Sequence, residues 1–185
     1  MITEKLIEDR EWSPESLEQL MDLLSGEARV EHERYSLEEL EVRPDAVLVT
    51  PSREYRLTQD FLENAAKSIR MPLGYAYDVS ADLFCENFAR RKRETTSVVT
   101  VCYGDDVVTG MTLDKRREYR PAPTFDVLRA LQHTEVWDSL ELRRAKISYR
   151  GVDIEFAQKG REIMPHDGHV VHPGIAIRNS ESGGR

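Results

Sequence analysis

Apolar and polar positions recur with two different periods along the chain, and the periods separate expected helices from expected strands. Apolar residues at helical spacing predict four helices, over residues 13–25, 58–71, 80–93 and 124–131. Period-two alternation, or a run that is apolar on both faces, predicts strands, over residues 46–50, 97–103, 107–113, 144–149, 152–157 and 170–177. This order of elements predicts an α+β fold, with a mostly antiparallel sheet and two or three helices packed on it.

Hydroxyl and proline residues set the expected ends of the helices. Hydroxyl side chains accept hydrogen bonds from the first N–H groups of a helix, and the caps expected here are Ser13, Thr58, Ser80 and Thr124. Ser36 and Glu39 fit a short capped turn, because a Glu three residues after a Ser returns the hydrogen bond. Pro72 disfavours helix at the residue before it, so the second helix is expected to end at Met71, with a tight link over Gly74–Tyr77.

The apolar faces of these elements predict one hydrophobic core. Leu83 is expected to face this core beside its helical neighbours. The residues expected to be mostly buried are Phe61, Ile69, Phe84, Phe88, Val99, Val101 and Met111.

Charge divides the sequence near residue 45. The chain of 185 residues has a net charge of −8, of which residues 1–45 carry −9 and residues 46–185 carry +1. We therefore expect an acidic N-terminal helical arm over residues 1–45 and an α+β domain over residues 46–185. Because the second part is nearly neutral and has local basic clusters, the acidic total does not exclude nucleic acid as a partner.

Hydropathy and cysteine usage indicate the compartment. No apolar run approaches the roughly 18 residues that cross a bilayer, and the first residues lack the apolar stretch of a secretion signal. We expect a cytoplasmic protein that makes no membrane contact. Cys85 and Cys102 are expected to be free thiols, because disulfides are rare in a reducing compartment.

Two stretches of the sequence resemble the phage/plasmid-like family, a domain of unknown function found on bacteriophages and plasmids. The first is the helix from Tyr55 that closes on an apolar-Pro-x-x-Tyr step at residues 71–75, and the second runs from Asp167 to Gly183. The most specific part is Asn179-Ser180-Glu181 after a β run; the family's Gly-Asp pair is inverted here to Asp167-Gly168.

The resemblance covers about residues 55–185, and the family domain usually continues with more strands. It implies a phage- or plasmid-encoded accessory protein, located in the host cytoplasm if phage-encoded, and a domain that is short or truncated at its C-terminus. The strand at 175–177 is then expected to lie at an unprotected sheet edge, or to lack a partner and fray, which lowers stability or favours self-association. The family has no established activity, so it assigns no catalytic residue and no cofactor.

Two groups of residues are candidates for catalysis or metal binding. Glu181 has the chemistry of a general base. His166, Asp167, His169 and His172 are of metal-ligand type, but their spacing by three along a strand places successive residues on opposite faces. A polar turn accounts for both groups as well, and we expect no cofactor.

Basic side chains supply candidates for nucleic-acid contact. The residues expected to follow a phosphate backbone are Arg90, Arg91, Lys92, Arg93, Lys115, Arg116, Arg117 and Arg120. Arg143, Arg144, Lys146 and Arg150 form another basic group, and tyrosines such as Tyr149 lie near these clusters and can stack on bases. The alternative is that these charges are a solvated face, neutralised by the acidic arm.

Three hypotheses for function follow, in order of preference. The first is a non-enzymatic accessory protein that contacts single-stranded nucleic acid. The second is a protein-interaction or assembly module that uses the N-terminal arm and an uncovered sheet edge. The third is an enzyme that uses Glu181 with the histidines.

Overall fold

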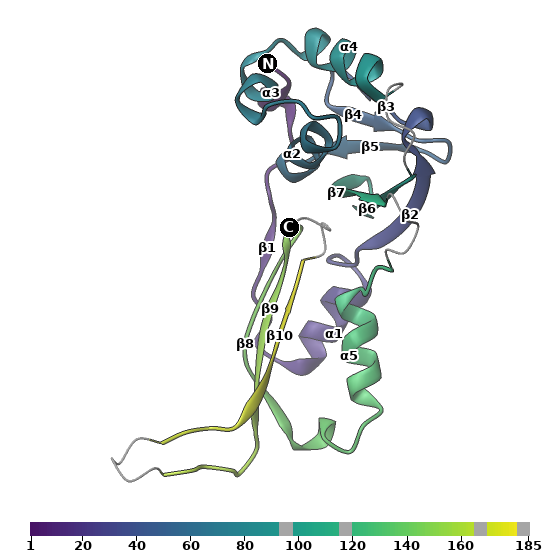
Figure 1. The fold of residues 1–185 in the computed structure, drawn as a ribbon. Coiled ribbons are helices and arrows are strands. Elements are labelled where there is room, and N and C mark those ends of the chain that lie inside the picture. The colour runs from purple at the N-terminus through teal and green to yellow at the C-terminus, as the bar shows by residue number, and fades with distance from the viewer. Residues whose placement is uncertain (93–97, 115–119, 165–169, 181–185) are drawn as a thin grey trace.

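The computed structural model describes residues 1–92, 98–114, 120–164 and 170–180, and its ten strands form two sheets (Figure 1). The larger sheet has the order β2 (Glu31–Ser36), β6 (Val98–Gly104), β7 (Val107–Asp114), β5 (Glu54–Leu57), β4 (Val47–Val49) and β3 (Glu41–Arg43). The smaller sheet has the order β1 (Glu11–Trp12), β8 (Leu140–Ser148), β9 (Gly151–Gln158) and β10 (Gly174–Asn179).

Strand pairing is antiparallel throughout both sheets except between β5 and β7, which run parallel. Three helices belong to the six-stranded sheet: α2 (Gln59–Ser68), α3 (Leu73–Asp78) and α4 (Ala81–Lys92). Two belong to the four-stranded sheet: α1 (Leu17–Ser25) and α5 (Thr124–Gln132). Short 3-10 turns lie at Ile2–Lys5, Leu37–Glu39 and Trp137–Ser139. The α+β fold class expected from the sequence is confirmed, with two sheets in place of one.

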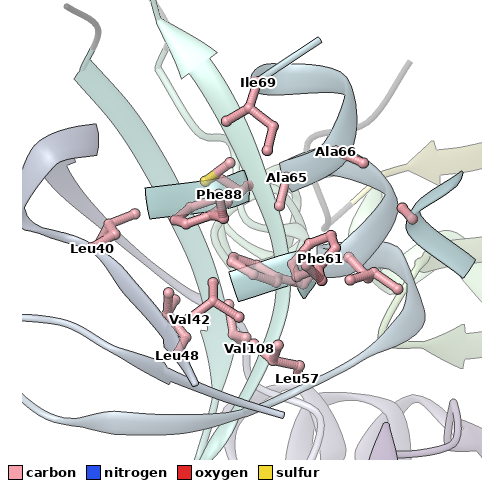
Figure 2. Packing of buried hydrophobic residues seen from close by; sticks show 14 of the residues in the cluster. Leu40, Val42, Leu48, Leu57, Phe61, Ala65, Ala66, Ile69, Phe88 and Val108 are labelled. Carbon is pink, nitrogen blue, oxygen red and sulfur yellow. The ribbon is translucent and has the colours of Figure 1, made fainter. Parts of the chain in front are cut away.

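The first core lies between the six-stranded sheet and its helices (Figure 2). Phe61 and Ala65 from α2 and Phe88 from α4 meet Leu48, Leu57 and Val108 from the strands. The seven residues that the sequence predicts as buried all lie here, each at most 3% exposed. Leu83 is 41% exposed, because Phe84 and Phe88, four residues apart, define the buried face of α4 and Leu83 lies to one side of it.

The second core lies under the four-stranded sheet. Leu20 and Leu24 from α1 and Leu128 from α5 pack against Ile154 and Phe156 of β9. The outer face of the same sheet carries alternating charges, among them Lys146, Arg144, Asp153, Glu155 and Arg178. Alternation of apolar and charged positions along each strand is what a sheet needs when one of its faces meets solvent.

The expected division at residue 45 does not describe the packing. Residues 1–45 supply β1, β2 and β3 to the two sheets, and Ile2, Leu37 and Leu40 are fully buried in the first core. The helical segment α1 belongs to the second core. The sequence pattern does not predict β2, because its residues, Glu31–Ser36, are mostly polar. The strand is instead defined by its backbone pairing with β6.

Several expected helix starts are confirmed, and other expected boundaries are corrected. The helix α2 ends at Ser68, three residues before the expected end at Met71. The Thr58 hydroxyl accepts from the Phe61 N–H at 3.2 Å, the Ser80 hydroxyl accepts from the Leu83 N–H at 3.3 Å, and Ser36 and Glu39 form the capping box. Ser16 rather than Ser13 caps α1, and Thr124 is the first residue of α5 rather than its cap. The expected tight link at Gly74–Tyr77 is part of α3, which begins directly after Pro72, a residue suited to a helix start.

Candidate functional site

A two-stranded ribbon extends from the four-stranded sheet beyond β9 and before β10 (Figure 1). Its described residues are 159–164 and 170–173, and these residues are called the ribbon below. Ile163 and Val171 hold its two sides together by exchanging backbone hydrogen bonds of 2.9 and 2.8 Å. The ribbon projects away from both cores, so its side chains depend on solvent or on a partner.

The ribbon exposes four large apolar side chains. Ile163 is 55% exposed, Met164 is 72% exposed, and Val170 and Val171 are each 46% exposed. Ile163 and Val171 are directly opposite, so their side chains share one face, and alternation places the neighbouring Met164 and Val170 on the other face. Each face of the ribbon therefore carries two exposed apolar side chains beside exposed polar ones, which are Arg161 on one face and Glu162 and His172 on the other.

Close backbone approach fixes the base of the ribbon at Gly174. A Cβ atom at this position would lie 1.9 Å from the carbonyl oxygen of Phe156, far inside van der Waals contact. The Pro173 carbonyl accepts from the Gln158 N–H at 2.7 Å at the same place. Glycine at residue 174 is therefore required for β10 to pair with β9 where the ribbon leaves the sheet.

The edge of the four-stranded sheet is formed by β10. In the described part of the chain β10 pairs with β9 alone. Gly174, Ala176 and Arg178 are exposed, while Ile175 and Ile177 are half-buried against the second core. The sequence-based expectation that residues 175–177 lie at a sheet edge holds for the described residues.

The Asn-Ser-Glu motif has a structural role in its first two residues. The Asn179 amide nitrogen donates to the Ala122 carbonyl at 2.8 Å and to the Thr124 hydroxyl at 3.1 Å. The Ser180 hydroxyl contacts the Arg150 carbonyl at 3.5 Å. Asn179 thus connects the end of β10 to the start of α5 through hydrogen bonds. Glu181 lies outside the described residues.

The basic residues proposed for nucleic-acid contact do not gather on one described surface patch. Arg91 donates to the carbonyls of Ile69 and Arg70, at 3.3 and 2.8 Å, and Lys92 donates to those of Glu38 and Leu40. Arg91 and Lys92 therefore fasten the end of α4 to neighbouring segments.

Two of the remaining residues of that set are described. Arg90 at the end of α4 and Arg120 before α5 are exposed. Arg93 and residues 115–117 lie outside the described residues. Contact of this set with nucleic acid stays a prediction.

The second basic group is paired with carboxylates. Arg144 contacts Asp153 and Glu155 at 3.1 and 2.9 Å. Lys146 contacts Glu11 at 2.9 Å, and Arg143 contacts Glu141 at 2.6 Å. Carboxylates of the acidic N-terminal residues thus meet part of this group, as the alternative of a neutralised, solvated face requires.

A cleft of about 720 Å³ lies between the N-terminal segment, the start of α2, the end of α3 and the β8–β9 turn. Arg150 of that turn contacts Asp60 at 3.2 Å and Asp9 at 3.4 Å. Glu4, Glu8 and Asp78 add further carboxylates to the lining. With these carboxylates around a single guanidinium, the cleft repels phosphate groups and does not suit a nucleic-acid backbone.

Two carboxyl groups of α2, Asp60 in the lining of this cleft and Glu63 further along the helix, differ in their electrostatics. Burial raises the pKa of Asp60 above its ordinary value, although the Arg150 charge acts in the opposite direction. The pKa of Glu63 is lowered, because the Tyr77 hydroxyl donates to it at 2.5 Å. The surroundings of Asp60 therefore disfavour its charged form. The contact between Arg150 and Asp60 joins the β8–β9 turn to α2.

The candidate metal ligands and the cysteines form no metal site in the described part of the chain. Of the four candidate ligands, His172 is described and lies exposed on the ribbon, and His166, Asp167 and His169 lie outside the described residues. The described residues hold no group of three His, Cys, Asp or Glu side chains arranged for a metal ion. Cys85 is a free thiol whose pKa burial raises to about 12, so it is not a thiolate at neutral pH. The side chain of Cys102 is not among those described.

Sequence reasoning missed the ribbon, although a signal was present. Residues 163, 164, 170 and 171 are apolar and flank a polar stretch, but two apolar residues at 163 and 164 are too short a run to predict a strand. In the described part of the chain, no helix has the length and apolar character that crossing a bilayer requires. Comparison with protein-family models, with curated proteins and with solved structures found no match to this chain.

Proposed function

We propose that this chain is a protein-interaction or assembly module whose contact surface is the ribbon together with the β10 edge. The observation that carries this proposal is the set of four exposed apolar side chains on both faces of the ribbon. Exposed apolar clusters on a soluble surface mark contact sites more often than isolated exposed residues do. An open strand edge next to them adds backbone groups that another chain can pair with.

The charges of the described residues favour protein contact over the first hypothesis. Arg91 and Lys92 are engaged with backbone carbonyls, and Arg144 and Lys146 with carboxylates. The cleft beside Arg150 has five carboxylates in its lining and one guanidinium. Contact with single-stranded nucleic acid stays a second proposal, and salt-sensitive retention on single-stranded DNA would support it.

The genomic setting is also a proposal. The Asn179-Ser180-Glu181 motif and the helix-Pro-Tyr step support a relation to the phage/plasmid-like family. The hydrogen bonds of Asn179 give the motif a structural reason that does not depend on catalysis. An enzyme that uses Glu181 and the histidines would need residues outside the described part of the chain.

A photo-crosslinking amino acid placed at Met164 tests the proposed function in cells that produce the protein. The matched control is the same amino acid at Leu83, which is exposed on α4 of the other sheet. We expect adducts of discrete mass from Met164 and none above background from Leu83. Equal adduct formation at the two positions would show that the ribbon is no more a contact surface than any exposed apolar residue, and the proposal would fail.

A further inference from the structure

We propose that the partner at this surface is a second copy of the chain, joined through antiparallel pairing of the two β10 strands about a two-fold axis at Ala176. This inference rests on the proposed function and names the partner of the same surface. It is carried by the backbone direction of β10 and by the side chains that such pairing would bring together.

The register of β10 on β9 shows which backbone groups face outward. The Gln158 N–H donates to the Pro173 carbonyl, and these residues are opposite in the same register that pairs Ile175 with Phe156 and Ile177 with Ile154. In an antiparallel pair, hydrogen-bonded and non-hydrogen-bonded positions alternate. The N–H and C=O groups of Ile175 and Ile177 therefore face β9, and those of Gly174, Ala176 and Arg178 face the open edge.

A two-fold axis at Ala176 uses all three outward-facing residues. Ala176 is then opposite the partner subunit's Ala176, and Gly174 is opposite the partner subunit's Arg178, on both sides of the axis. Each of these positions is hydrogen-bonded across the new pair, because both residues of each pair face outward. If the axis lay one residue away, a residue at one end of Gly174–Arg178 would have no residue of that segment opposite it in the partner.

The side chains in this register are mutually compatible. Arg178 stands opposite a glycine, so no like charges are opposed, and Asp153 already contacts the same Arg178 at 3.2 Å. Ile175 is opposite the partner subunit's Ile177, and both residues are half-buried on the side of the second core. Pairing would join the two second cores along this line and cover isoleucine surface that is open at the edge of one copy.

The same arrangement would place each ribbon next to the other copy of the chain. Pro173, where the ribbon begins, would lie opposite the partner subunit's Asn179, where that strand ends. Each ribbon would therefore begin next to the other copy of the chain. Apolar side chains of the ribbon, such as Ile163 and Val171, could then contact that copy's surface. A contact of this kind is isologous and closed, so it yields a dimer and not a filament.

Cysteine cross-linking tests the register directly. Ala176→Cys would place two sulfur-bearing residues opposite each other at a Cα separation of about 5.5 Å, within the range of a disulfide. The matched control is Arg178→Cys on the same exposed face, whose two copies would be roughly 13 Å apart. We expect most of the Ala176→Cys chain to form a covalent dimer under mild oxidation. Arg178→Cys should stay at the level of the unsubstituted chain, which carries Cys85 and Cys102.

Sedimentation provides a second, independent measurement. The unsubstituted chain should sediment at twice its mass of 21.3 kDa, and Ala176→Pro should shift it to the monomer. Proline at residue 176 removes an outward-facing N–H and leaves the hydrogen bonds to β9 in place, which circular dichroism would check. Equal cross-linking of the two cysteine variants, or a monomer at all concentrations, would overturn the β10 pairing. If that happens while Met164 still captures a different protein, only the inference fails; the proposed function fails separately, if Met164 captures no more than Leu83.

Discussion

The two sheets of this protein differ in how much of their surface is buried. Around the six-stranded sheet, large side chains such as Phe61, Phe84 and Leu57 are completely buried, and helices cover one face. The four-stranded sheet has a smaller core, a charged outer face and an edge strand that continues into the exposed ribbon. The first sheet therefore has the larger core, and we expect it to supply most of the folding free energy, whereas the surface that we propose for a partner lies on the second.

The largest expected effect comes from removing a ring from the first core. Phe61→Ala or Phe88→Ala should lower the free energy of unfolding by about 3–5 kcal/mol, because both side chains are at most 1% exposed. Denaturant unfolding measures the change, with Leu83→Ala on α4 as a surface control. An unchanged midpoint in either phenylalanine variant would mean that the first core is not the main source of stability.

A smaller effect is expected at the base of the ribbon. Gly174→Ala should destabilise the protein by about 1–3 kcal/mol, because its Cβ would meet the Phe156 carbonyl oxygen at 1.9 Å. Gly74→Ala is the matched control in the other half of the molecule: apart from its chain neighbours and its own helix backbone, no atom lies within 4 Å of a Cβ at this position, and alanine favours helix over glycine. If thermal unfolding ranks the two variants in the opposite order, the pairing of β9 and β10 at the ribbon base is wrong.

The motif residue Asn179 should matter less. Asn179→Ala removes two hydrogen bonds that join β10 to the start of α5, at a cost of about 1–2 kcal/mol. Ser180→Ala should change the free energy of unfolding by less, since the Ser180 hydroxyl lies 3.5 Å from the Arg150 carbonyl, at the long limit of a hydrogen bond. Chemical denaturation of both variants provides the measurement, and an equal loss in the two would remove the structural reason given for the motif's asparagine.

The smallest expected effect is a dependence on pH at the cleft. The pKa of Asp60 in the folded protein is raised by burial, so the stability linked to its protonated form is present at low pH and is lost as pH rises through that raised pKa. Asp60→Asn cannot ionise, and unfolding should therefore show the unsubstituted protein losing stability relative to this variant as pH rises above about 3.8. A difference that is constant with pH would show that the Arg150 charge cancels the effect of burial, and a difference that changes in the other direction would show that it outweighs burial.

The sequence predicted the first core well because its helices carry regular apolar stripes and clear caps. Phe61 follows a Thr58 cap, and Phe84 follows a Ser80 cap, so local signals and burial agree there. The division at residue 45 was wrong because charge composition does not report backbone pairing: polar β2 pairs with β6 across about seventy residues of sequence. The ribbon was missed for a similar reason, since its strands are defined by contacts between residues such as Ile163 and Val171 and not by a periodic pattern.

Hydrogen exchange along β10, measured by NMR at low and high protein concentration, tests the proposed contact surface most directly. The amides of Ile175 and Ile177 face β9 and should be protected at every concentration. The amides of Ala176 and Arg178 face outward and should become protected only as concentration rises, while amides of the first sheet such as that of Val101 stay unchanged. Rapid exchange of Ala176 and Arg178 at all concentrations would contradict the account, because the edge of the four-stranded sheet would then remain open.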